Sequence, residues 1–198
     1  MLIIFIKNPE IGKVKTRLAA TIGAQKALDI YKKLLKYTAQ ITGELSLEKH
    51  VWYSSYIDKN DPFFKSDYLK FLQAEGGLGE KMSEAFEMVF DQGAEKVVII
   101  GSDCAELEPH HITEAYDQLD KVDVVLGPAK DGGYYLLGMN HFYPELFKEM
   151  TWSNSEVLHE TLKRAQGSNL KSYLLPELND VDTFEDFQLI EPRLRKDG

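Results

Sequence analysis

The chain has 198 residues, which is the length of about one ordinary domain. Hydrophobic residues make up 43% of the sequence and charged residues 28%, a globular composition that excludes disordered, collagen-like and coiled-coil proteins. The formal net charge of −9 argues against a general electrostatic partner such as nucleic acid or anionic lipid.

Two further features bear on where the protein works. No apolar run approaches the roughly 20 residues that a membrane-spanning helix needs, and the apolar start at 2–6 lacks the basic region and cleavage site of a signal peptide. The single cysteine, Cys104, has no partner for an intrachain disulfide. We therefore expect a cytoplasmic protein without a membrane span.

Apolar patterning predicts that strands and helices alternate along the chain. Short runs rich in apolar or β-branched residues predict strands, and apolar residues at three-and-four spacing predict amphipathic helices. In chain order, the sequence predicts a strand at 2–6, a helix at 24–41, strands at 50–56 and 68–72, a helix that opens at 76–79 and continues to 90, a strand at 97–100, a helix from 109 to 119, strands at 122–126 and 134–137, a helix at 155–165, an extended segment at 170–175 and a helix at 184–194. This order predicts a layered α/β domain with a mostly parallel sheet.

The loop between the first strand and the first helix is basic. Four cations stand there against Glu10 alone, namely Lys7, Lys13, Lys15 and Arg17. A loop at the carboxyl end of a parallel strand points N–H groups at a bound anion, so these residues suit phosphate, although a solvated basic loop would carry the same charges. Val14 stands where a Walker A loop has Ser or Thr, which excludes that motif. The candidate substrate ligands in this loop are Lys7, Gly12, Lys13, Lys15, Thr16 and Arg17.

An aspartate follows the most apolar strand of the sequence. Asp103 comes directly after Gly101 and Ser102 at the carboxyl end of 97–100, where a buried strand delivers a carboxylate to the ligand crevice. Such a carboxylate suits a hard divalent cation, and the alternative is that it caps a turn. We expect the neighbouring Cys104 to be a packed thiol rather than a nucleophile.

A second acidic group lies near the C-terminus. In an extended segment residues i and i+2 face the same way, so Asp180 and Asp182 can present two carboxylates together to a divalent cation. Thr183 with Asp186 resembles a helix capping box, which explains Asp186 but not the pair before it.

The segment 127–138 contains Asp-Gly-Gly between two predicted strands. A tight turn explains these residues. They are also suited to an acceptor pocket in which a carboxylate accepts a hydrogen bond from a hydroxyl group. The candidate residues are Asp131, Gly132, Gly133 and Tyr134.

A glycine-rich loop at 73–82 joins a predicted strand to a predicted helix. It either approaches a base or ribose closely or only turns the chain. The candidate residues are Gly77, Gly79 and Lys81.

Five blocks, taken in order, resemble one bacterial family. The blocks at 7–18, 77–82, 101–107, 127–138 and 180–186 are similar to the motifs of the GT-A-type nucleotide-diphospho-sugar transferase-like family, a glycosyltransferase-like and nucleotidyltransferase-like group. The chain departs from the family pattern at Lys81, where arginine is usual, and at Ala105, where proline usually follows the cysteine.

The resemblance implies a fold and a metal site. It implies a single GT-A-like domain over 1–198, with three α/β/α layers, a mixed and mainly parallel sheet, and a nucleotide in the N-terminal half. Asp103 matches the aspartate that binds Mg²⁺ or Mn²⁺. Asp180 or Asp182 matches the second acidic ligand of related guanylyl- and cytidylyltransferases.

The expected function is that of a metal-dependent transferase with a nucleotide donor and a small-molecule acceptor. We favour nucleotidyl transfer from an NTP to a phosphorylated acceptor with release of pyrophosphate, with Lys15, Arg17 and Asp103 as catalytic residues, because positioning, a metal and cations carry such chemistry. The alternatives are glycosyl transfer from a nucleotide sugar and a nucleotide-binding module without catalysis.

Overall fold

The structure is a computed structural model that describes residues 1–196. Its elements, in chain order, are β1 (Leu2–Ile6), α1 (Thr16–Ile22), α2 (Ala24–Gly43), β2 (Lys49–Tyr53), β3 (Tyr68–Leu72), α3 (Leu78–Asp91), β4 (Val97–Ile100), α4 (Pro109–Gln118), β5 (Val124–Pro128), β6 (Tyr134–Met139), the 3-10 helix η1 (Pro144–Leu146), α5 (Val157–Gly167), β7 (Ser172–Leu174) and α6 (Phe184–Lys196). Within these residues, no helix combines the length and the apolar character needed to cross a membrane.

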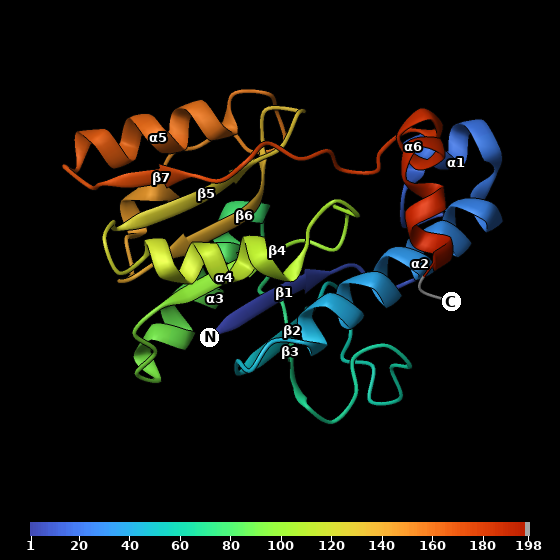
Figure 1. The fold of residues 1–198 in the computed structure, drawn as a ribbon, viewed down its shortest axis with the longest axis horizontal. Helices are drawn as coiled ribbons and strands as arrows, with labels where there is room; N and C mark the ends of the chain where they lie inside the picture. The colour runs from blue at the N-terminus through green and yellow to red at the C-terminus, as the bar shows by residue number, and fades with distance from the viewer. Residues whose placement is uncertain (197–198) are drawn as a thin grey trace.

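One sheet organises the molecule (Figure 1). Its seven strands have the order β3-β2-β1-β4-β6-β5-β7, and β6 runs antiparallel to both of its neighbours whereas all other pairs are parallel. The predicted mixed and mainly parallel sheet is therefore confirmed.

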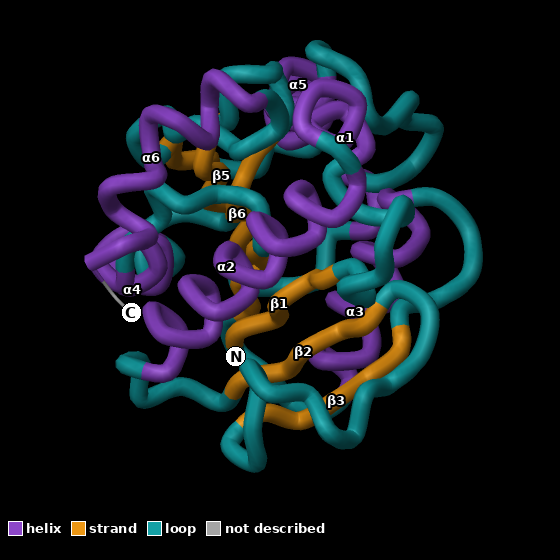
Figure 2. Tube along the Cα trace, turned by 90° about the vertical axis from the view of Figure 1, so that its right-hand side faces the viewer, coloured by secondary structure: helices purple, strands orange, loops and turns teal. Residues whose placement is uncertain are grey.

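Helices cover both faces of the sheet, which confirms the three predicted layers (Figures 1 and 2). Side chains of successive strand residues point to opposite faces, so Leu2 and Ile4 of β1 pack into one core cluster and Ile3 into the other. The first cluster joins the sheet to α1, α2, α4 and α6, and the second joins it to α3, α5 and η1.

The structure adds one helix that the sequence analysis does not predict. The first predicted helix begins at residue 24, whereas the structure has an earlier helix, α1, that begins at Thr16. Only Leu18 of α1 is buried, so this seven-residue helix carries no extended apolar period. Gly23, with a φ of 88°, ends α1 and directly precedes α2, and a change of direction of this kind favours glycine.

Parallel pairing brings the chemically interesting segments to one edge of the sheet. Since β1 pairs in parallel with β4, the basic loop that follows β1 and the acidic segment that follows β4 leave the sheet at the same edge. Since β7 pairs in parallel with β5, the chain after β7 leads to the same region. There the backbone N–H of Val181 donates to the carbonyl of Asp103 at 2.9 Å.

Candidate active site

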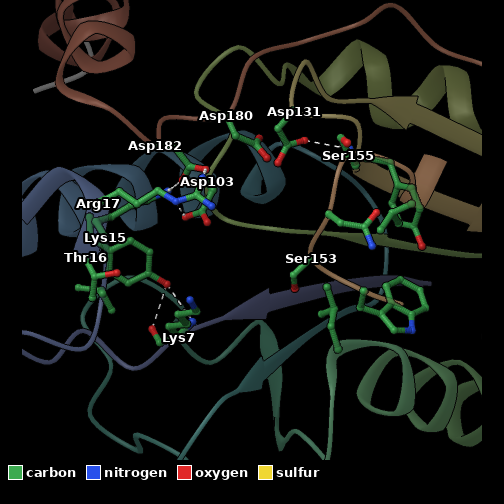
Figure 3. Close-up of a pocket in the computed structure, with 18 of the residues that line it drawn as sticks. Lys7, Lys15, Thr16, Arg17, Asp103, Asp131, Ser153, Ser155, Asp180 and Asp182 are labelled. Atoms are coloured by element: carbon green, nitrogen blue, oxygen red, sulfur yellow. Dashed lines mark hydrogen bonds and ion pairs between the residues drawn. The ribbon is translucent and has the colours of Figure 1, made fainter. Parts of the chain in front are cut away.

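A cleft of about 510 Å³ opens at this edge of the sheet (Figure 3). One side is lined by the basic loop and the start of α1, and the other by the turn between β5 and β6 and the segment before α5. Acidic residues after β4 and β7 lie between these two sides (Figure 3). The lining residues that carry a charge are Lys7, Lys13, Lys15, Arg17, Asp103, Asp131, Asp180 and Asp182.

The Lys15 side chain lies next to the acidic side chains of the cleft. Its side chain is only 4% exposed, and its ammonium lies 2.9 Å from the Asp103 carboxylate and 3.4 Å from that of Asp182. Burial alone would lower the pKa of Lys15, but the carboxylates of Asp103, Asp182 and Asp180 together raise it above its ordinary value. The residue has a φ of 47°, a left-handed conformation that lysine seldom adopts. Lys15 is therefore a charged residue that its acidic neighbours hold in an unfavourable backbone geometry.

Arg17 and Lys13 are the accessible cations of the basic loop. Arg17 is 78% exposed, and its guanidinium lies 3.5 Å from Asp182. Lys13 is 68% exposed and pairs with Glu10 at 2.7 Å. Ion pairs this exposed are weak, so both side chains are available to an anionic ligand.

Asp180 is the most perturbed acid of the cleft. Burial raises its pKa to about 7, and the negative charge of Asp103 acts in the same direction, whereas Lys15 opposes the shift. A neighbouring carboxylate behaves differently. Asp186 accepts hydrogen bonds from the Asn179 side-chain amide at 2.9 Å and from the Thr183 hydroxyl and backbone N–H, each at 2.8 Å, and these bonds lower its pKa despite partial burial. The Asp186 N–H donates to the Thr183 hydroxyl at 3.2 Å, so the predicted capping box is confirmed.

A buried tyrosine joins the basic loop to the segment after β4 that carries Asp103. The Tyr31 hydroxyl of α2 accepts from the backbone N–H of Lys7 at 2.9 Å and donates to the Lys7 carbonyl at 3.0 Å. It also lies 3.2 Å from the hydroxyl of Ser102. Desolvation raises the pKa of Tyr31, so the hydroxyl stays neutral and keeps its proton for these bonds.

Asn8 fastens the same loop to the chain after β2. Its side-chain oxygen accepts from the backbone N–H of Ser55 at 2.9 Å, and its amide group donates to the carbonyl of Tyr56 at 2.9 Å. The loop is thus fixed on two sides next to the cleft.

Close backbone packing builds the opposite side of the cleft. A Cβ atom on Gly79 of α3 would lie 2.1 Å from the indole nitrogen of Trp152, so only glycine lets this ring approach the helix. A Cβ atom on Gly132, which has a φ of 90°, would lie 2.1 Å from the carbonyl oxygen of Ser155. Both glycines act by positioning the segment 152–155 that lines the cleft.

The structure brings most of the predicted site residues together. Those that line the cleft are Lys7, Lys13, Lys15, Thr16, Arg17, Asp103, Asp131, Gly133, Tyr134, Asp180 and Asp182. Five others do not line it, namely Gly12, Gly77, Gly79, Lys81 and Gly132. From the glycine-rich loop 73–82, Leu78 alone reaches the cleft lining. Cys104 is buried, and burial raises the pKa of its thiol, in agreement with a packed and unreactive cysteine.

Several lining residues are not among the predicted site residues. They are Val14, Tyr31, Leu78, Val157 and the segment 152–155. Tyr31 lies at a helical core position, and the polar segment before α5 resembles any surface loop, so neither has a local sequence signal of function.

The three acidic side chains between the two sides are chemically suited to a divalent metal. Carboxylate oxygens are the donors that Mg²⁺ and Mn²⁺ prefer. Among residues 1–196, no group of three or more His, Cys, Asp or Glu side chains is close enough to hold a metal ion as it stands. The Lys15 ammonium lies among these carboxylates and balances part of their negative charge.

Solved structures share this fold over nearly the whole chain. A protein from Desulfovibrio desulfuricans G20, which carries the provisional name nucleotide-diphospho-sugar transferase, is 28% identical with a TM-score of 0.86, and the match covers 98% of this chain and 96% of that one. The inositol-1-phosphate CTP transferase from T. maritima is 14% identical with a TM-score of 0.64, covers 98% of this chain and 94% of that one, and shows the fold alone. The chain therefore has the nucleotide-diphospho-sugar transferase fold.

A curated relative matches part of the chain. The 2-phospho-L-lactate guanylyltransferase of Methanocaldococcus vulcanius is 26% identical over 117 residues, which are 58% of this chain and 50% of the relative. The chain thus matches only half the length of this relative. A family profile matches residues 37–154, more than half of the chain. The expected GT-A-like resemblance is confirmed, and the chain belongs to the bacterial family described as "uncharacterized protein conserved in bacteria (DUF2064)".

Proposed function

We propose that the protein is a nucleotidyltransferase that transfers an NMP unit from an NTP to a phosphorylated small molecule and releases pyrophosphate. The observation that carries the proposal is the shared cleft, in which a basic loop lies beside the carboxylates of Asp103, after the neighbouring strand β4, and of Asp180 and Asp182, in the chain after β7. The names of the guanylyltransferase relative and of the CTP transferase with the same fold support this reaction class.

The basic side of the cleft would bind the triphosphate. Arg17 is exposed and can donate two parallel hydrogen bonds to phosphate oxygens, and Lys7 and Lys13 add positive charge nearby. The tyrosine and asparagine anchors described above hold this loop in place before the ligand arrives, which lowers the entropic cost of binding.

The transfer itself needs little covalent help from the protein. A phosphate oxygen of the acceptor forms a bond to the α-phosphorus of the NTP, and the bond from that phosphorus to the bridging oxygen of the β-phosphate breaks as pyrophosphate leaves. Positioning and stabilisation of the charge on the leaving group supply the catalysis. Lys15 and Arg17 are the residues of this chain that would stabilise that charge.

A divalent metal fits the proposal. Asp103, together with Asp180 or Asp182, would hold Mg²⁺ or Mn²⁺, which when bound neutralises phosphate charge. Asp180 has a pKa of about 7, so near neutral pH it can give up its proton to become a ligand.

The test measures pyrophosphate. The protein is incubated with each of the four common NTPs, Mg²⁺ and a panel of phosphorylated metabolites, and pyrophosphate release is followed together with product formation by phosphorus NMR. We expect release with at least one NTP that depends on both the acceptor and the metal. Metal-dependent hydrolysis of a nucleotide sugar, without pyrophosphate from any NTP, would replace the proposal with glycosyl transfer, and nucleotide binding with neither reaction would leave a non-catalytic module.

A matched pair of variants separates the loop from general charge. Arg17→Met should weaken NTP binding about 10- to 150-fold, the value of one charge-assisted hydrogen bond or more. Lys26→Met removes the same charge from the exposed face of α2, outside the cleft lining, and should leave binding unchanged. Equal affinities of the two variants for the NTP would exclude Arg17 as a phosphate ligand.

A further inference from the structure

The two sides of the cleft differ in charge. All four cations of the lining come from the basic loop and the start of α1: Lys7, Lys13, Lys15 and Arg17. Across the cleft lies what we call the hydroxyl wall, which consists of Asp131, Gly133, Tyr134, Trp152, Ser153, Asn154, Ser155 and Val157. Among the described lining residues, this wall has one charge, the Asp131 carboxylate, and no lysine or arginine.

The polar groups of the hydroxyl wall are only partly used by the protein. Asp131 is exposed, and one of its oxygens, Oδ1, accepts from the backbone N–H of Gly133 at 2.9 Å, which fixes the carboxylate. Its other oxygen, Oδ2, has no hydrogen-bond partner among the described residues. The Ser153 hydroxyl has no hydrogen-bond partner among the described residues, and Ser153 has a φ of 62° that few non-glycine residues adopt. Figure 3 shows Asp131, Ser153 and Ser155 on the side of the cleft that faces Arg17 and Lys15.

Asn154 holds the loop that presents these groups. Its side-chain amide donates to the carbonyl of Thr151 at 2.8 Å, and its side-chain oxygen accepts from the backbone N–H of Glu156 at 2.7 Å. Its own hydrogen-bonding capacity is therefore largely used within the loop. The Ser155 hydroxyl donates to the Glu156 carboxylate at 3.5 Å, a long hydrogen bond on the exposed surface. The Ser153 hydroxyl and the Asp131 carboxylate remain for a ligand, and the Ser155 hydroxyl can still accept.

This set of groups selects one ligand chemistry. A carboxylate oxygen accepts strong hydrogen bonds from hydroxyl groups, and serine hydroxyls both donate and accept. A negatively charged group at the same place would face Asp131 without a cation to offset the repulsion. The wall therefore favours a neutral group with several hydroxyls and disfavours a carboxylate.

We infer that the hydroxyl wall binds an uncharged sugar or polyol group of the substrate, and that Asp131 is the residue that rejects carboxylate-bearing substrates. The inference rests on the proposed function, in which the basic side of the cleft binds the phosphates. The sugar or polyol group can belong to the phosphorylated acceptor or, in glycosyl transfer, to the donor. The two sources share their chemistry and are separated by the test.

The test uses two pairs of ligands that differ at one carbon. The first pair is α-D-glucose 1-phosphate and α-D-glucuronic acid 1-phosphate, titrated into protein saturated with the α,β-methylene analogue of the NTP that binds most tightly. The second pair is UDP-glucose and UDP-glucuronic acid, titrated into the protein alone. Each uronic acid replaces a hydroxymethyl group with a carboxylate. Affinities are measured by calorimetry and need no turnover.

In one of the two pairs, we expect the neutral ligand to bind about 10- to 100-fold more tightly than its uronic acid, the size of a partly screened charge repulsion. Asp131→Asn keeps the acceptor for the Gly133 N–H, so the turn is preserved, and should reduce the preference to about threefold or less. Asp131→Lys should reverse it. Glu95→Gln removes an equal charge from an exposed residue outside the cleft lining and should keep the preference.

The outcomes show which substrate carries the sugar or polyol group and whether the inference fails. A preference in the first pair assigns the wall to the acceptor, and a preference in the second pair assigns it to the donor. Equal binding of the two members in both pairs, an unchanged preference in Asp131→Asn, or no binding of any of the four ligands would overturn the inference. Absence of pyrophosphate release with a preference intact would instead overturn only the proposed nucleotidyl transfer.

Discussion

Replacing Lys15 with methionine removes the ammonium from the carboxylates of the cleft and keeps a side chain of similar length. The ammonium lies 2.9 Å from Asp103 and 3.4 Å from Asp182. At an effective dielectric constant near 20, each attraction amounts to about 5 kcal/mol before any desolvation is counted. Loss of one partner from a fully buried pair costs about 3–5 kcal/mol. The carboxylates here are 42% and 36% exposed, so water screens them and we expect a net loss of about 2–3 kcal/mol.

The loss should appear in thermal unfolding. For a protein of this length, 1 kcal/mol shifts Tm by about 2–4 °C, so Lys15→Met should lower Tm by about 4–12 °C in metal-free buffer. Lys13→Met, which removes an exposed lysine paired with Glu10, should change Tm by about 1 °C or less.

The same substitution should change metal binding in the opposite direction. Without the ammonium, the negative charge of the carboxylates is no longer balanced by Lys15. We therefore expect Mn²⁺ to bind the nucleotide-free variant at least about 10-fold more tightly than the wild type. Mn²⁺ at a concentration of 100 times its Kd should then raise the free energy of unfolding of the variant by about 2.7 kcal/mol. A variant with unchanged Tm and unchanged Mn²⁺ affinity would refute the reasoning, because the ammonium would then contribute nothing to the cluster.

Three further substitutions test other parts of the site. Asp180 has a folded-state pKa of about 7, above its ordinary value of 3.8, so its contribution to stability is full below pH 4 and is lost as the pH rises to about 7. Urea unfolding from pH 4 to 8 in the presence of a chelator should show a smaller decline in stability for Asp180→Asn than for the wild type. At pH 8 the variant should be more stable by about 2–4 kcal/mol. Equal declines in the two proteins would contradict the raised pKa of Asp180. Tyr31→Phe leaves the Lys7 N–H without its acceptor and should cost about 1–3 kcal/mol in urea unfolding, so a loss near zero would mean that the hydroxyl does not anchor the loop. Gly79→Ala should cost about 1–3 kcal/mol and change the tryptophan fluorescence because its Cβ atom displaces Trp152, whereas Gly77→Ala meets only Glu80 at 3.7 Å and should be tolerated.

The regular elements were predictable where apolar patterning is local. The bounds of β1, β3 and β4 are those predicted, because each is a short apolar or aromatic run that polar or turn residues follow. Pro109 begins α4 as expected for a residue favoured at the first helical position. β2 ends at Tyr53 and not at residue 56, because the chain after it turns to contact Asn8 through tertiary hydrogen bonds. Such contacts leave no periodic signal in the sequence.

The acidic side of the site was predictable for a different reason. Asp103 follows an apolar strand, and parallel neighbours end at one edge of a sheet, so its place beside the basic loop follows from topology. The part of the hydroxyl wall at 131–134 follows from topology too, because β5 runs in the same direction as β4. The segment 152–155 does not, because its place depends on Trp152 against Gly79 and on Ser155 against Gly132. Close contacts between distant segments are decided by packing, which local patterns do not record.

Lys15 shows the limit of local reasoning most clearly. Its charge and its position in a basic loop predict a phosphate ligand, whereas its ammonium contacts Asp103 and Asp182 in the structure. A left-handed lysine is unfavourable by about 1–2 kcal/mol, so local propensity argues against the geometry that makes these contacts possible. The ion pairs, formed with residues 88 and 167 positions away, help to offset that cost, as does the carbonyl of Lys15, which accepts from the N–H of Ala19 at the start of α1. Because ion pairs of this strength require that the partners stay charged, the conformation of Lys15 depends on the state of its carboxylates. A ligand that neutralises them would therefore remove part of what stabilises the strained backbone.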